Sequence, residues 1–108
     1  MLQTIGFDSL EVREIVDFNK LFSEYSRKIE SKLKKISSFV VHVKEYNKTG
    51  SRKKFSIHVR VVAPTGILEA DAWDWDFRRT LHKVFKKLEH EIEHKFHVSD
   101  EHKSIRKF

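Results

Sequence analysis

The residues best suited to chemistry lie near the end of the chain, where His90-Glu91-Ile92-Glu93-His94 reads H-E-x-x-H. On a helix, this spacing lets two imidazoles hold one zinc ion while the glutamate activates a water molecule. A catalytic zinc needs a third ligand, and His97 stands where one class of zinc proteases has the glycine that continues the motif. We therefore expect adventitious metal binding at His90, His94 and His97 at most, and no bound cofactor.

A second group of candidates lies where a strand is expected to lead into the last helix. Three carboxylates there, Asp71, Asp74 and Asp76, could suggest a magnesium site. The simpler interpretation is that Asp76 caps the helix and Asp74 favours its dipole. Trp73 and Trp75 could stack on bases, but packing is the commoner role of tryptophans at such a junction.

Two further patterns were considered for catalysis or switching. No Ser or Thr lies in a nucleophile-elbow setting, and no Gly-rich loop could cradle a phosphate, so we do not expect an enzyme. His42 and His58 are expected on neighbouring strands, where a surface or cross-strand role is favoured over a pH-sensitive pair.

The composition excludes several other classes of protein. The 108 residues suffice for one domain, and the absence of cysteine excludes disulfides, thiolate zinc sites, iron–sulfur clusters and cysteine nucleophiles. No apolar run approaches the ~20 residues of a membrane helix. We expect a cytoplasmic protein without a membrane or small-molecule partner, and a monomer is favoured.

The charge is unevenly distributed along the chain. The net charge is +6, and residues 19–63 carry twelve bases against three acids, whereas residues 64–76 carry four acids and no base. Such polarity suits a polyanionic partner, although a charged surface that only keeps a small domain in solution is an open alternative.

Hydrophobic periodicity predicts the elements that carry these residues. The chain favours one N-terminal strand, within 2–7 or 10–16, and Asp17 as the cap of the first helix. The remaining elements are expected as a helix over 18–36, strands over 38–46, 53–63 and 67–73, and a helix over 77–97. The order β-α-β-β-β-α predicts an α+β two-layer sandwich, with two helices on one face of a mainly antiparallel sheet. Residues 1–97 would form the domain and 98–108 a flexible basic tail.

Basic residues follow the outer faces of both predicted helices and the first hairpin. Such stripes contact phosphates and release counterions, giving affinity without sequence readout. The candidate RNA-binding residues are Lys20, Arg27, Lys28, Lys34, Lys35, Arg52, Lys53, Lys54, Arg79, Lys83, Lys86, Lys87, His90 and His94. Exposed aromatic residues on the sheet are not evident from the sequence, so base stacking is not the expected mode.

Order and motifs together resemble a known family. The matching segments are Ala63-Pro64-Thr65-Gly66-Ile67-Leu68-Glu69-Ala70, Asp76, Lys87-Leu88-Glu89 and, on the first helix, Lys32-Leu33-Lys34-Lys35-Ile36. Pro64, Gly66, Leu68, Ala70, Asp76, Leu81, Lys87, Leu88, Glu89 and Ile92 fall on the family pattern without a gap. The chain, over about residues 10–97, resembles the ribosome hibernation-promoting factors and ribosome-associated inhibitors, in their short form.

The resemblance implies a fold similar to a double-stranded-RNA-binding domain and a function without catalysis. Members of the family bind the small ribosomal subunit at the decoding channel and silence idle ribosomes by steric occlusion. The basic residues of the two helices would then contact ribosomal RNA. Three alternatives stay open: a generic double-stranded-RNA-binding module, an H-E-x-x-H zinc hydrolase, and a protein-interaction domain with a charged surface.

Overall fold

The computed structural model describes residues 2–33, 35–47 and 53–105, and the side chains among them up to residue 95. The elements are β1 (Leu2–Ile5), a short 3₁₀ helix η1 (Phe7–Ser9), α1 (Val12–Leu33), β2 (Ser38–Asn47), β3 (Lys53–Ala63), β4 (Gly66–Asp74) and α2 (Phe77–Ile105). The predicted order β-α-β-β-β-α and the α+β class are confirmed.

The four strands form one mixed sheet in the order β1-β2-β3-β4. β2, β3 and β4 pair antiparallel as a meander, and β1 adds to the edge of β2 in parallel. Alternation within β3 assigns its two faces as predicted: Ile57, Val59 and Val61 are buried, while Ser56, His58 and Arg60 lie on the other side.

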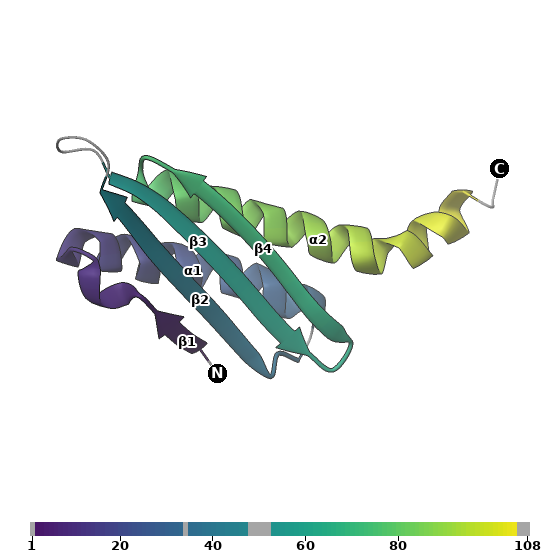
Figure 1. Cartoon of the computed structure of the whole chain (residues 1–108). Coiled ribbons are helices and arrows are strands. Elements are labelled where there is room, and N and C mark those ends of the chain that lie inside the picture. Colours follow the sequence, from purple (N-terminus) through teal and green to yellow (C-terminus); the bar gives the residue numbers. More distant parts are fainter. Residues whose placement is uncertain (1, 34, 48–52, 106–108) are drawn as a thin grey trace.

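Both helices cover the same face of this sheet, which leaves the other face open (Figure 1). α1 packs over β2, where the Phe22 and Phe39 ring centroids lie 4.9 Å apart, and α2 packs over β3 and β4. The two helices meet where Tyr25 stacks on Phe85 at 5.1 Å. The apolar faces of the sheet and of both helices thereby close one core.

The first helix begins earlier than predicted, so Asp17 as its cap is wrong. Asp17 lies inside α1, and the backbone N–H of Glu11 instead donates to the Glu14 carboxylate at 2.9 Å. Val12 and Val16 are 79 % and 57 % exposed. These two residues, which contributed to the strand-like pattern in the sequence, therefore lie on the solvent-facing surface of the helix. Of the two N-terminal segments predicted as a strand, only the first is one, as β1. The helix also ends at Leu33, three residues before the predicted end at 36.

Gly6 shows why the chain can turn between β1 and η1. Its φ is +80°, a left-handed conformation that glycine adopts without strain, and a Cβ there would collide with the carbonyl oxygen of Val43. Close approach of the backbone to β2 therefore requires glycine at this position.

The last helix continues beyond the predicted boundary. α2 runs to Ile105, whereas the sequence predicted a helix only to residue 97 and a tail without structure after it. The apolar periodicity ends near Phe96, but the helix continues through a segment that contains neither Pro nor Gly. Residues 106–108 lie outside the described residues.

Candidate nucleic-acid interface

The outer surface of α1 presents the most open group of the predicted RNA-binding cations. Lys20, Arg27 and Lys28 are all exposed, on the side of the helix opposite its buried stripe. Lys28 also lies 5.2 Å from the centroid of the Tyr25 ring. Lys35 is exposed just past the end of the helix. None of these four cations forms an ion pair with another described residue, so their charges are available to a partner.

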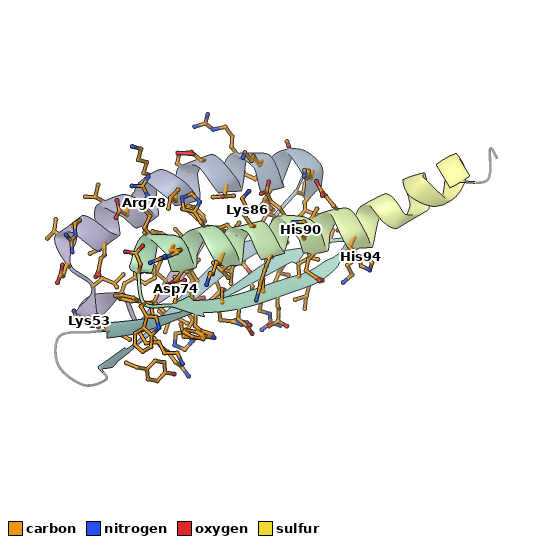
Figure 2. All side chains as sticks on the ribbon, turned by 90° about the horizontal axis from the view of Figure 1, so that it is seen from above. Lys53, Asp74, Arg78, Lys86, His90 and His94 are labelled. Carbon is orange, nitrogen blue, oxygen red and sulfur yellow. The ribbon has the colours of Figure 1, made fainter. Side chains whose placement is uncertain are left out.

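The neighbouring helix continues this surface with Lys86, His90 and His94, which follow one another along α2 (Figure 2). All three side chains are exposed. Two contacts hold the helices side by side: Tyr25 and His82 share a hydrogen bond of 3.1 Å, and Lys32 pairs with Glu93 at 2.9 Å. Burial is the main cause that raises the pKa of the Tyr25 hydroxyl, so this hydroxyl stays neutral between the helices.

Four other predicted cations have partners within the protein. Lys53 pairs with Glu45 at 3.0 Å, and this hydrogen bond is the first cause that raises the lysine pKa. Lys83 and Arg79 both contact the Asp74 carboxylate, at 2.6 and 3.4 Å. Lys87 donates to the carbonyl oxygen of Asp71 at 2.9 Å, which anchors α2 on β4. The acids offset the charge that Lys53, Lys83 and Arg79 offer to RNA, and the hydrogen bond of Lys87 directs its ammonium towards β4.

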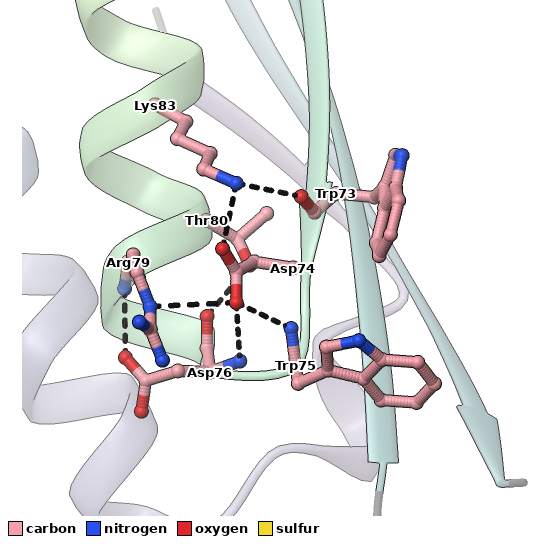
Figure 3. A network of polar contacts seen from close by, with 7 residues as sticks. All are labelled: Trp73, Asp74, Trp75, Asp76, Arg79, Thr80 and Lys83. Carbon is pink, nitrogen blue, oxygen red and sulfur yellow. Dashed lines mark hydrogen bonds and ion pairs between the residues drawn. The ribbon is translucent and has the colours of Figure 1, made fainter.

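The carboxylates before α2 have the structural roles predicted for them. Asp76 caps the helix, because its carboxylate accepts the backbone N–H of Arg79 at 2.8 Å. Asp74 accepts the N–H groups of Trp75 at 2.6 Å and Asp76 at 3.3 Å (Figure 3). The hydrogen bond from Lys83 is the first cause that lowers the pKa of Asp74. These contacts give Asp74 and Asp76 structural roles at the start of α2.

The H-E-x-x-H segment forms one turn of α2 with its two histidines in solvent. His90 and His94 are exposed, Ile92 between them is buried in the core, and Glu93 pairs with Lys32 of α1. In the described part of the chain, no three His, Asp or Glu side chains gather to hold a metal ion. The side chain of His97 is outside that part.

The predicted cross-strand role of His42 and His58 agrees with the sheet. The two residues are direct partners in the β2–β3 register. His58 Nε2 lies 2.8 Å from the Glu69 carboxylate on β4, so its nearest charged partner is an acid rather than the other imidazole.

The open face of the sheet carries aromatic residues that the sequence analysis did not predict there. Trp73, Tyr46 and Trp75 are 52 %, 44 % and 37 % exposed. The expectation that packing is the role of the tryptophans is wrong for Trp73, and the sheet exposes rings that were not evident from the sequence. The alternation of side chains along β4 indicates this exposure: Trp73 is on the same side of the strand as the exposed Glu69 and Asp71, away from the core.

Two predicted cations, Lys34 and Arg52, lie outside the described residues. Lys54 is half-buried on the open sheet face, apart from the helical surface. Among the described helices, none is long and apolar enough to cross a bilayer.

The comparisons with known proteins bear on the fold. No protein-family model matches the chain, and no curated protein matches its sequence. The fold is similar to a solved structure described as a ribosomal subunit interface protein from Coxiella burnetii, with a TM-score of 0.65 and 19% identity. That match covers 87% of this chain and 94% of the other. This likeness shows the same fold over nearly the whole length of both chains, in agreement with the predicted resemblance.

Proposed function

We propose that this protein binds the small ribosomal subunit through the basic surface of its helical layer and inhibits translation by occupying the decoding channel. The observation that carries the proposal is the fold, which is similar along almost its entire length to a ribosomal subunit interface protein. The family resemblance in the sequence points to the same partner through separate evidence.

The charge of the helical layer supplies the physical basis for binding. We define the helical basic surface as the predicted RNA-binding lysines and arginines of the helical layer that are exposed and whose side chains form no ion pair or hydrogen bond with another described residue: Lys20, Arg27, Lys28, Lys35 and Lys86. Each cation that neutralises a phosphate releases condensed counterions, so affinity falls steeply as salt rises. His90 and His94 extend this surface along α2 as exposed side chains.

The proposed mechanism is occlusion without catalysis. A protein of this size, seated where messenger and transfer RNA would lie, blocks them by excluded volume. The basic surface needs only to position the domain on the RNA backbone, because phosphate contacts fix orientation without reading sequence. The proposal places the protein in the cytoplasm, acting as a monomer.

Co-sedimentation with purified small ribosomal subunits tests this function. The wild-type protein is expected to bind saturably, at one copy per subunit, with affinity that falls as salt rises. The double variant Arg27→Glu, Lys28→Glu should bind about 100-fold more weakly at physiological salt, because two phosphate contacts become repulsive. Its salt slope should be shallower by about 2.

Arg60→Glu, which makes the same change of net charge as the single variant Arg27→Glu, provides the control for that variant. Arg60 is an exposed cation on the open sheet face, so its reversal changes the net charge while leaving the helical layer intact. Subunit binding unchanged by the helical variant, or equally weakened by Arg60→Glu, would contradict the proposed surface. Naked duplex RNA serves as competitor: if it displaces the protein from subunits, the function reduces to general duplex-RNA binding.

A further inference from the structure

The open face of the sheet holds a cluster of three aromatic rings and a lysine. Tyr46 and Lys54 are partners in the β2–β3 register, and Trp73 pairs with Ser56, two residues further along β3. Trp75 follows at the end of β4. Tyr46, Lys54, Ser56 and Trp73 line a depression of about 310 Å³. We call Tyr46, Lys54, Trp73 and Trp75 the aromatic cluster.

The cluster combines ring faces with a positive charge. The Lys54 ammonium lies 4.4 Å from the centroid of the Trp73 ring and 5.9 Å from that of Tyr46. The two indoles meet edge to face, with centroids 6.2 Å apart and an interplanar angle of 89°. This arrangement forms a corner in which a flat ring can stack on one indole while its edge meets the other.

The aromatic cluster is held in place from the opposite side of β4. Lys83 bridges the Asp74 carboxylate at 2.6 Å and the carbonyl oxygen of Trp73 at 3.4 Å, and Asp74 accepts the Trp75 N–H at 2.6 Å (Figure 3). Both indoles lie on the side of the strand away from α2 (Figure 3). α2 fixes the backbone of this corner. The rings are therefore already ordered in solvent, and binding a ligand costs little further conformational entropy.

Charge around the cluster favours an anionic, aromatic ligand. Lys44 is exposed two register positions from Lys54, on the same face of the sheet, and it forms no ion pair with another described residue. The acids of the same face are Glu69 and Asp71; Glu69 pairs with His58 at 2.8 Å. A nucleotide chain matches this surface, since its bases can stack on the rings while its phosphates contact the two lysines.

We propose that the aromatic cluster binds unpaired bases of single-stranded RNA, as a second RNA-binding surface opposite the helical basic surface. Trp73 and Tyr46 are the stacking residues, and Lys54 and Lys44 contact the backbone. Duplex RNA is not a ligand of this cluster, because its bases are already stacked and its grooves do not present ring faces. This proposal is independent of the ribosomal partner proposed above.

The experiment uses a fluorescein-labelled oligouridylate of about ten nucleotides, within the range that a small single-strand-binding surface covers. Anisotropy gives the affinity. Tryptophan fluorescence of the unlabelled complex reports on the site itself, since the chain has only two tryptophans and both belong to the cluster. The wild-type protein should bind with saturable quenching of this fluorescence.

The variants separate stacking from charge. Trp73→Ala should weaken oligonucleotide binding about tenfold, and Trp73→Phe should restore most of it. Ile67→Ala is the matched control, because Ile67 lies on the same strand and the same face and is 45 % exposed. Lys54→Gln should lower the salt slope by about 1. Circular dichroism of each variant checks that the fold is retained.

Two outcomes would overturn the proposal. The first is equal affinity for an abasic oligonucleotide of the same length, which has the phosphates without the bases. The second is binding that Arg27→Glu, Lys28→Glu abolishes while Trp73→Ala leaves it unchanged, since the oligonucleotide would then lie on the helices. Neither outcome depends on ribosomal subunits, so failure here is distinct from failure of the proposed function.

Discussion

The two outer faces of this domain differ in how they are built. The helical layer exposes cations and no aromatic ring among its described side chains, because Tyr25 and Phe85 turn inward to the core. The open sheet face exposes three aromatic rings and places a lysine against two of them. Charge alone suits a phosphate backbone, whereas rings beside charge suit an unpaired base.

The comparison shows how one sheet can supply two different surfaces. The residues of β3 alternate between the core and the open face, so the same strand anchors the helical layer and carries Lys54. The two surfaces therefore share a core but not their exposed side chains. A variant on one face should leave the other intact, and a variant in the core should affect both.

Leu81→Ala should produce the largest effect, since it acts on both faces at once. Leu81 is fully buried between α2 and the sheet, so its truncation leaves a cavity and should lower the free energy of unfolding by about 2–5 kcal/mol. Urea denaturation measures the loss. Val16→Ala, at a position 57 % exposed, should change stability by less than about 0.5 kcal/mol. Equal effects of the two substitutions would contradict the assigned core.

Asp74→Asn should have an intermediate effect and should distinguish the faces. The pKa of Asp74 is lowered from its ordinary value of 3.8, so the ionised carboxylate stabilises the folded state above that value. This contribution is lost as the pH falls through the lowered pKa. The variant should therefore have a lower urea midpoint than the wild type at neutral pH, and the difference should close in acid.

The same variant should loosen the aromatic cluster, because Asp74 holds the backbone of Trp75. Oligonucleotide binding should weaken while binding to ribosomal subunits persists. Asp71→Asn is the control: its exposed carboxylate forms no ion pair with another described residue. If the urea midpoint of Asp74→Asn stays below that of the wild type at low pH, the asparagine disturbs the turn for a reason other than the lost charge.

Glu24→Gln should give the smallest effect, an increase in affinity for ribosomal subunits that is specific to the helical face. Glu24 lies beside Arg27 and Lys28 on α1, and its removal leaves those cations unopposed. Subunit binding should tighten by about two- to fivefold, and oligonucleotide binding should not change. Glu69→Gln makes the same charge change on the open sheet face and should give the reverse pattern. Identical responses on both assays would show that net charge, rather than location, controls binding.

Much of the fold was predictable because local chemistry determines it. The alternation over 53–63 assigns each side chain of β3 to a face, and Asp76 before an apolar stripe of period 3.6 marks the start of α2. The predicted start of the first helix was wrong because the local pattern before it also fits a strand. Leu10, Val12 and Val16 imitate a strand, but the structure is helical from Val12, with Val12 and Val16 in solvent and Glu14 buried.

The candidate site was predictable in part. Helical spacing correctly identified Lys20, Arg27, Lys28 and Lys86 as exposed cations. It could not identify the cations with internal partners, because Glu45 meets Lys53 only across the paired β2–β3 hairpin, and Asp74 meets Lys83 only once α2 folds back on β4. Trp73 and Trp75 were assigned to packing because their local setting is common to buried tryptophans.

By itself, the sequence determined the order of elements, the faces of the central strands and the sign of the surface charge, since these depend on periodicity and composition over short distances. Tertiary structure decided which sheet face stays open and which cations remain available to a partner. Both properties depend on how whole helices and strands pack against one another. Packing both helices on one face of the sheet leaves the tryptophans of β4 in solvent, beside a lysine from β3.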